Sequence, residues 1–241
     1  MSPFVEEVMQ VIIEEKPAVV ATGAGNPGKY IASLKEAEIK IMPVVASVAM
    51  AKKMEKDGAD AIIAEGTEAG GHIGELTTMV LVPQVVDAVS IPVVAAGGIA
   101  DSRGAVAAFA LGADGIQVGT RFICSTECIA HDNYKQAVIK AKDRDAVVTG
   151  RSTGAPVRAL KNKLTREYDK LEKQGASFEE IEALGVGGLR RAFEEGDTQT
   201  GSLMAGQSAA MVHEIQPCAD IIKSYFDGTE AVIETITSKL K

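Results

Sequence analysis

The sequence predicts an α/β protein built on a parallel β-sheet, and three features indicate this fold class. The 241-residue chain is 46% hydrophobic but only 4% aromatic. Its apolar residues, mostly Val, Ile and Ala, gather in five short runs that each end in a glycine-rich or polar turn. Continuous hydrophobicity is typical of parallel strands covered on both faces. Helical patterns separate these runs, and such alternation implies right-handed crossovers between parallel strands.

The order of the expected elements follows from this alternation. The predicted strands are residues 18–21, 39–45, 61–64, 93–96 and 115–118. The predicted helices are residues 4–13, 30–34, 47–56, 76–89 and 101–111. A weak internal repeat supports the assignment, because Gly-Ala-Asp-Ala-Ile at 58–62 recurs as Gly-Ala-Asp-Gly-Ile at 112–116. In both places a helix is expected to end and a strand to begin.

The chain changes character after Phe122 and becomes polar and charged. Residues 134–142 and 160–174 have helical periodicity, and Ser177 with Glu180 forms a capping box at the start of another helix. A closing helix is expected over 219–226. The sequence therefore predicts two domains: a β/α part over residues 1–122, and a helical insertion with closing C-terminal helices packed on it over residues 123–241.

Composition excludes several function classes. The formal net charge of −8 argues against a nucleic-acid partner, because such proteins usually carry a basic face. The sequence has no apolar run near the roughly 20 residues that span a bilayer, so no membrane association is expected. Three cysteines are too few for a disulfide scaffold, and this predicts a cytoplasmic location.

Two glycine-containing loops give the strongest functional signal. Residues 95–101 follow a strand and open a helix, and residues 115–121 come one β/α unit later. Glycines such as Gly97, Gly98 and Gly119 let a phosphate approach the backbone, and helix N-termini supply N–H donors. In (β/α)8 barrels the loops after strands 7 and 8 commonly hold a phosphate. The expected strands would then be numbers 4 to 8; the alternative is that these glycines only form tight turns.

The second signal is the stretch 64–75, which follows the third expected strand. His72 lies among glycines at the predicted carboxyl edge of the sheet, where it could reach a ligand and donate a proton near neutral pH. Glu65, at the strand tip, could hydrogen-bond a polar ring edge or simply cap a turn. Glu68 and Glu75 are expected to be exposed.

Other candidates are weaker. Residues 22–26 end the first expected strand and should face the same site, although a turn alone explains them. The small residues of 201–207 could let a late segment approach the pocket or let helices pack closely. His131 and His213 are expected at the surface. Two cysteines, Cys124 and Cys128, have helical spacing without further ligands, so packing and no metal site are predicted.

The chain resembles the nitronate monooxygenase (2-nitropropane dioxygenase) superfamily and, within it, the FMN-dependent enoyl-acyl-carrier-protein reductases of type II. The residues that carry the resemblance are 64–66, 70–74, 95–99 and 117–122, with the later stretches 149–154 and 201–207. The family has a (β/α)8 TIM-barrel fold with an added helical region, and it binds FMN. The resemblance thus implies a partial FMN-binding barrel over residues 1–122.

The resemblance also assigns roles to single residues. His72 matches the histidine beside the flavin ring and is the expected catalytic residue. Glu65 favours the reductase, because the monooxygenases usually have glutamine there. The residues expected to bind FMN are Glu65, Gly70 and Gly71 along the flavin, and Gly97, Gly98, Gln117, Val118, Gly119 and Thr120 at its phosphate end.

The chain departs from the family pattern at its N-terminal end. Strands 1–3 of the barrel, which contribute to the flavin site, have no counterpart before the first expected strand. The sequence therefore predicts an incomplete barrel in which strands 4–8 are present and strands 1–3 are missing. Such a sheet cannot close, and its open edge is an aggregation hazard.

The resemblance implies an oxidoreductase that transfers a hydride from NADH or NADPH through flavin N5 to an enoyl thioester, small or bound to acyl carrier protein, as in fatty-acid synthesis. Family members are often homodimers. Three alternatives stay open: a nitronate monooxygenase that oxidises alkyl nitronates with O2, an isomerase or lyase acting on a phosphorylated metabolite, and an inactive fragment that binds a partner.

Overall fold

A computed structural model describes residues 4–23 and 25–240, and these form two compact units. The first, which we call the sheet unit, comprises residues 4–66, 75–96 and 108–117. The second, the hairpin unit, comprises residues 67–74, 97–107 and 118–240. The units interleave along the chain, so a single division at residue 122 does not describe them. Helix α5 (Ser102–Ala110) runs from one into the other.

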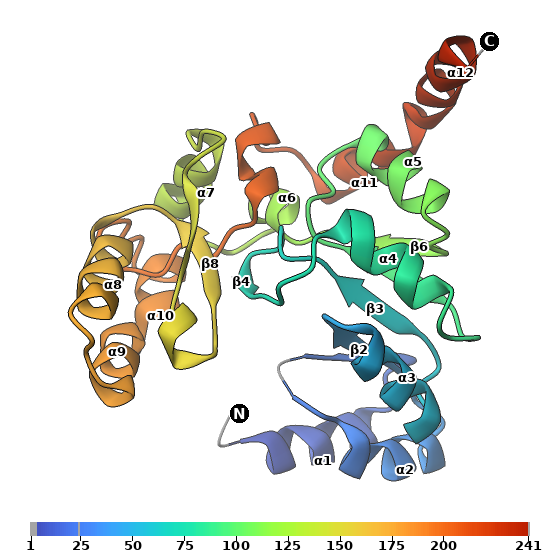
Figure 1. Ribbon diagram of the computed structural model, residues 1–241, viewed down its shortest axis with the longest axis horizontal. Helices are drawn as coiled ribbons and strands as arrows, with labels where there is room; N and C mark the ends of the chain where they lie inside the picture. Colours follow the sequence, from blue (N-terminus) through green and yellow to red (C-terminus); the bar gives the residue numbers. More distant parts are fainter. Residues whose placement is uncertain (1–3, 24, 241) are drawn as a thin grey trace. The chain divides into compact units, whose positions relative to one another are not determined.

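The sheet unit contains a five-stranded parallel sheet, as predicted (Figure 1). The strands lie in the order β1-β2-β3-β5-β6, so the strands of this sheet follow one another in chain order. Each lies within one residue of its predicted bounds. The strands are β1 (Val19–Thr22), β2 (Lys40–Val45), β3 (Ile62–Glu65), β5 (Val93–Ala96) and β6 (Gly115–Gln117).

Crossover helices pack on the strands that they connect. Helix α2 packs on β2, α3 on β2 and β3, and α4 on β3 and β5. The Ser47 hydroxyl caps α3 by accepting a hydrogen bond from the Met50 N–H over 3.3 Å. The helices of this unit are α1 (Val5–Glu15), α2 (Gly28–Glu36), α3 (Val48–Asp57) and α4 (Thr78–Val86).

The internal repeat has the same structure at both places. Gly58 and Gly112 end their helices with φ of +104° and +93°, which favours glycine. The aspartate two residues later then links neighbouring strands. The Asp60 carboxylate accepts from the Ile41 N–H (3.0 Å), and the Asp114 carboxylate accepts from the Val93 N–H (2.9 Å). The motif is therefore a structural device for turning from helix to strand.

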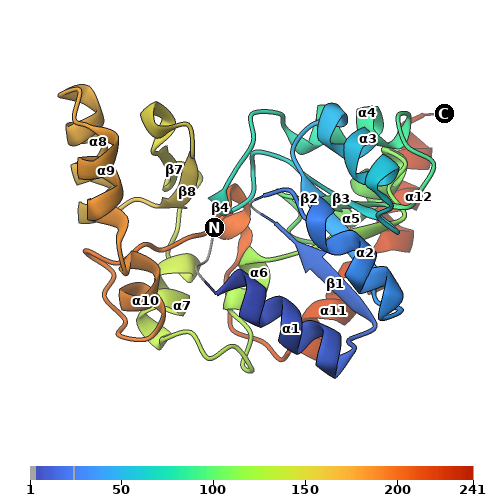
Figure 2. The same cartoon turned by 90° about the horizontal axis from the view of Figure 1, so that it is seen from below.

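Burial differs from the prediction at the edge of the sheet. The central strand β3 is buried over Ile62–Ala64, but β1 alternates between exposed and half-buried residues. Strand β1 pairs only with β2 in the described sheet, and Val19 is 47% exposed. Figure 2, a view from below, shows β1 between α1 and α2. The open edge predicted at the first strand is therefore present in the described residues, and the expectation that every strand is covered on both faces is wrong for β1.

The hairpin unit contains strands where only helices were predicted. Strands β7 (Ala146–Thr149) and β8 (Val157–Leu160) form an antiparallel hairpin, and the two-residue strand β4 (Gly71–His72) pairs with β8. The prediction of residues 123–200 as purely helical is wrong because these strands are short. Charged flanking segments and an arginine inside β8 hid their apolar pattern.

The predicted helices of this unit are largely confirmed. The capping box of Ser177 and Glu180 opens α9. The helix predicted from residue 160 begins at Lys163, because Asn162 and Thr165 form a capping box there and residues 157–160 belong to β8. Helix α12 was not predicted. The remaining helices are α6 (Thr120–Ile123), α7 (Asp132–Ile139), α8 (Lys163–Lys173), α9 (Phe178–Gly185), α10 (Gly188–Phe193), α11 (Cys218–Asp227) and α12 (Thr229–Lys239).

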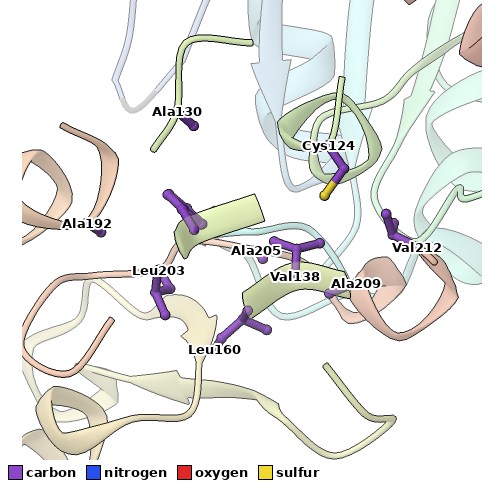
Figure 3. Packing of buried hydrophobic residues seen from close by; sticks show 10 residues of the cluster. Cys124, Ala130, Val138, Leu160, Ala192, Leu203, Ala205, Ala209 and Val212 are labelled. Carbon is purple, nitrogen blue, oxygen red and sulfur yellow. The ribbon is translucent and has the colours of Figure 1, made fainter. Parts of the chain in front are cut away.

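A separate apolar cluster stabilises the hairpin unit (Figure 3). It joins β8 through Leu160 and α7 through Val138 to the segment that carries Leu203 and Ala205. Cys124 is fully buried there, and burial raises the pKa of its thiol to about 11. The packing role predicted for Cys124 is therefore confirmed. In the part of the chain that the structure describes, each helix is too short or too polar to cross a membrane.

Candidate functional site

His72 is held in an extended strand. It pairs with Val157 across β4 and β8, and the adjacent Ile73 N–H donates to the Pro156 carbonyl over 3.1 Å. The preceding Gly71 has φ of +80°, a conformation that favours glycine. The His72 side chain is exposed and lines a cavity. The sequence analysis placed His72 among glycines after a strand and did not predict this strand pairing, which fixes the backbone.

A buried arginine secures the loop that leads to His72. Arg158, the register partner of Gly71, is only 5% exposed. Its Nε donates to the Thr67 carbonyl over 3.0 Å, and its Nη1 donates to the Ala146 carbonyl over 3.2 Å. Burial lowers the pKa of Arg158, and the negative charge of Glu68 opposes this. Sequence reasoning missed this residue, although a cation inside an apolar run was a usable signal.

The glycines before His72 permit a close backbone approach. A Cβ at Gly70 would lie 2.7 Å from the Ala205 carbonyl carbon and 2.8 Å from the Gly206 nitrogen. The Gln207 N–H donates to the Glu68 carbonyl over 2.9 Å, which ties the two segments together. The small residues of 201–207 thus let a late segment approach the His72 loop, one of the two roles that the sequence suggested.

Further hydrogen bonds and contacts bring in two more segments. The Gly206 N–H donates to Thr120 Oγ1 over 2.9 Å, and Thr120 is buried at the start of α6. The turn at Gly97 and Gly98 has φ of +94° and +72°, and a Cβ at Gly98 would lie 3.2 Å from the Glu68 Cβ. Loops predicted to hold phosphate and the loop of His72 therefore meet within the hairpin unit.

Glu68 corrects one prediction. The sequence suggested an exposed side chain, but Glu68 is half-buried between the turn of Gly98 and the segment at Gln207. It links the predicted phosphate turn to the loop of His72. The prediction was wrong because glutamate is usually exposed, and nothing in the local pattern indicated packing on a distant glycine.

Of the other predicted site residues, Val118 and Gly119 lie in the hairpin unit, whereas Glu65 and Gln117 lie in the sheet unit. Glu65 ends β3 and pairs in register with Ala96, which pairs in turn with Gln117 at the end of β6. Two of the residues predicted to bind FMN therefore flank one strand at the carboxyl edge of the sheet. Thr22 ends β1 at the same edge, and its Oγ1 is buried without a hydrogen-bond partner among the described residues. Residue 24 of the predicted 22–26 loop lies outside the described residues.

A cavity of about 410 Å³ lies in the hairpin unit next to His72. The turn 149–155 forms part of its wall. Gly150 and Gly154 in this turn both have φ of +75°, and the Glu172 carboxylate accepts from the N–H groups of Gly150 (3.1 Å) and Ser152 (2.9 Å). Burial raises the pKa of Glu172, but these donors outweigh it and the net pKa is lowered. Glu172 thus holds this wall in place.

The remaining histidines differ in part from the prediction. His213 is exposed, as expected. His131 is half-buried and caps α7, since its Nδ1 accepts from the Asn133 N–H over 3.1 Å. A histidine directly before Asp132 could have been recognised as a cap. Among the three histidines, all of which the structure describes, His72 is the one that lines the cavity of about 410 Å³.

A model of the family described as nitronate monooxygenase matches residues 2–228. The chain belongs to the nitronate monooxygenase family. It is 37% identical over 226 residues to the "probable nitronate monooxygenase" of Staphylococcus saprophyticus, a match that covers 89% of this chain and 64% of that protein. The chain therefore spans less than two thirds of the length of this curated relative.

Two solved structures of the superfamily are similar to this chain. FabK from Thermotoga maritima has a TM-score of 0.95 and 48% identity, over 99% of this chain and 76% of that one. Nitroalkane oxidase from Streptomyces ansochromogenes has a TM-score of 0.79 and 29% identity, over 96% and 69%. The five-stranded sheet is a curled half-barrel, consistent with the predicted TIM-barrel type of fold.

The residues present fit the FMN that the nitronate monooxygenase family implies. A Cβ at Gly119 would meet no atom of the described residues within 4 Å, so its backbone is open to an approaching phosphate. Gly97 and Gly98 both have a positive φ, which favours glycine, and Gly98 is exposed.

The burial of Glu65 at the end of β3 can be tested by substitution. Burial raises the pKa of its carboxyl group above the ordinary value of 4.5. The pKa of Glu65 is therefore higher in the folded state than in the unfolded state. The contribution of such a group to the free energy of unfolding is most favourable below the unfolded-state pKa, and it falls as the pH rises through the folded-state pKa. We therefore expect Glu65→Gln to raise the free energy of unfolding at neutral pH, by less than about 1 kcal/mol because the group is partly solvated.

Urea unfolding of the parent and the variant at several pH values would measure this effect. The increase in the free energy of unfolding of Glu65→Gln over the parent should vanish at a pH below 4.5. Glu36→Gln, at an exposed position in α2, is the matched control and should leave the pH dependence unchanged. A pH-independent difference between Glu65→Gln and the parent would contradict the assignment.

Proposed function

We propose that the protein is an FMN-dependent oxidoreductase that reduces enoyl thioesters of acyl carrier protein with NADH or NADPH. The observation that carries this proposal is the meeting of the His72 loop with the Gly97–Gly98 turn, Thr120 and residues 205–207 within the hairpin unit. The likeness to FabK, an enoyl-acyl-carrier-protein reductase of type II, supports the substrate class.

Three further observations favour the reductase over the monooxygenase. Glu65 is a carboxyl group where the monooxygenases usually have glutamine. The cavity of about 410 Å³ beside His72 is also larger than a small alkyl nitronate needs. FabK is 48% identical to this chain and nitroalkane oxidase 29%, which points in the same direction.

Each predicted site residue has a proposed task. When bound, FMN would supply hydride transfer between a nicotinamide and the β-carbon of the thioester. The His72 imidazole would hydrogen-bond the thioester carbonyl and stabilise the charge that develops on its oxygen. Gly70 and Gly71 would border the flavin with Glu65, while Gly97, Gly98, Gln117, Val118, Gly119 and Thr120 would hold its phosphate end.

A nitronate monooxygenase is the second candidate function. The 37% identity to a curated protein with that name favours it. In this role His72 would act on an alkyl nitronate, with O2 as the co-substrate and no nicotinamide. The same fold and the same FMN residues serve both functions, so the substrate must be tested directly.

Several broader expectations stay predictions. We propose that the five parallel strands correspond to strands 4–8 of an eight-stranded barrel. We also propose a cytoplasmic protein, with a homodimer as the expected assembly and no nucleic-acid or membrane partner.

The visible spectrum of the purified 241-residue chain tests the function. We expect added FMN to bind, NADH or NADPH to bleach its absorbance without oxygen, and crotonyl thioester to restore the absorbance. Oxygen consumption with an alkyl nitronate and no nicotinamide would favour the monooxygenase. A chain that does not bind FMN would contradict both, and would favour the isomerase, the lyase or the inactive fragment.

A further inference from the structure

The cavity beside His72 is lined mainly by apolar side chains, although the unit around it is rich in charge. Its wall comes from β4 and β8, from the turn 149–155, from helices α8, α9 and α10, and from residues 202–204. The apolar side chains are those of Ala155, Val157, Phe178, Ile181, Val186, Leu189 and Met204. Such a lining with a few polar groups is typical of a site for an apolar ligand.

Large apolar residues of the cavity lining are exposed. Phe178 is 50% exposed, Val186 70% and Leu189 45%, and all three line the cavity. Single exposed apolar residues are ordinary, but three that share one cavity indicate a surface that a ligand covers. They come from α9, α10 and the connection between these helices.

Glycines in the connection between α9 and α10 bring this wall into place. A Cβ at Gly185 would overlap the Tyr168 hydroxyl oxygen, and one at Gly188 would lie 3.3 Å from the Ser202 Cβ. Gly187 has φ of +68°, which side chains rarely adopt. A larger residue at Gly185 would displace the Tyr168 side chain, and one at Gly188 would crowd Ser202, so these glycines leave room for two residues of the cavity wall.

We propose that this cavity holds the unbranched acyl chain of the thioester substrate, with the wall of α9 and α10 setting the chain length that fits. The proposal rests on the proposed function, because it places the reacting thioester at His72 and the apolar tail along Val186 and Leu189. The other polar groups of the lining, such as Tyr168 and Arg190, leave most of the surface apolar.

The volume sets an upper limit on the chain. A water molecule in the liquid occupies about 30 Å³. If a methylene group occupies a similar volume, the cavity has room for about a dozen methylene groups. Each buried methylene contributes about 0.8 kcal/mol, which is about fourfold in affinity. Binding should therefore tighten steadily along a series of chains and level off near about 12 carbons.

Calorimetric titration with saturated acyl-coenzyme A tests the proposal, because a saturated chain binds without being reduced. For the 241-residue chain we expect affinity to rise from the butyryl to the decanoyl compound. Val186→Asp places a charge in the apolar lining and should weaken decanoyl binding about tenfold or more, with little change for butyryl. Ile129→Asp, at an 87% exposed position outside the cavity, is the matched control and should bind as the parent does.

A second variant covers the case in which Val186→Asp does not fold. Ala155→Phe adds volume at an exposed position of the lining and should shorten the longest chain that binds. Affinity that does not depend on chain length, or that Ile129→Asp lowers as much as Val186→Asp, would overturn the proposal. If the protein reduces enoyl thioesters at rates that do not depend on chain length, the assignment of the cavity to the acyl chain is wrong and the proposed function stands. If binding depends on chain length but the flavin is not reduced, the proposed function is wrong and the assignment of the cavity stands.

Discussion

Replacing Gly70 by alanine should destabilise the hairpin unit by about 1–3 kcal/mol and abolish FMN binding. A Cβ at this position would lie 2.7 Å and 2.8 Å from the carbonyl carbon and Cα of Ala205, and 2.8 Å from the Gly206 nitrogen. All three are backbone atoms, so no side-chain rotation can relieve the overlap. The segment 205–207 would have to move, and with it the hydrogen bond from the Gly206 N–H to Thr120 Oγ1.

Gly119→Ala is the matched comparison, because it adds the same methyl group where the described residues leave open space. We expect this variant to unfold in urea as the parent does, yet to bind FMN more weakly if a phosphate lies against that backbone. Denaturation curves and FMN titration of both variants separate the two effects. A Gly70→Ala variant as stable as the parent would show that the close approach of residues 205–206 does not occur in solution.

Sequence reasoning worked best where local pattern and global fold agree. The parallel strands were located to within a residue because each is a run of β-branched and small residues that ends in a turn. The internal repeat was recognised from the sequence alone. The structure explains it, because Asp60 and Asp114 each accept a hydrogen bond from the backbone of a neighbouring strand. Local signals of this kind need no knowledge of distant partners.

The parts that were missed depend on contacts far apart in the chain. Strand β4 has only two residues, one of them a glycine, and it exists because β8 pairs with it. Arg158 and Glu68 look like surface residues in sequence, yet one holds the loop of His72 and the other packs on Gly98. Tertiary packing overrides local preference at such places, and these are also the places where the candidate site is built.

Replacing His72 by alanine should lower the turnover of enoyl thioester by about 10²- to 10⁴-fold, the usual contribution of a positioned proton donor. The side chain is exposed in the short strand β4, whose backbone pairing with Val157 needs no imidazole. The variant should therefore fold, bind FMN and show the parent's flavin spectrum. The loss should appear in kcat, because the carbonyl oxygen gains charge only as the reaction proceeds.

Two further variants refine this result. His213→Ala removes an exposed histidine of the same unit and should retain full turnover, which makes it the control for general effects of the substitution. His72→Gln keeps a hydrogen-bond donor but cannot transfer a proton near neutral pH. If glutamine restores most of the lost turnover, His72 acts by hydrogen bonding to the carbonyl; if it restores none, the imidazole donates the proton. Unchanged turnover of His72→Ala would remove His72 from the chemistry altogether, and the wall of the cavity would then be its only role.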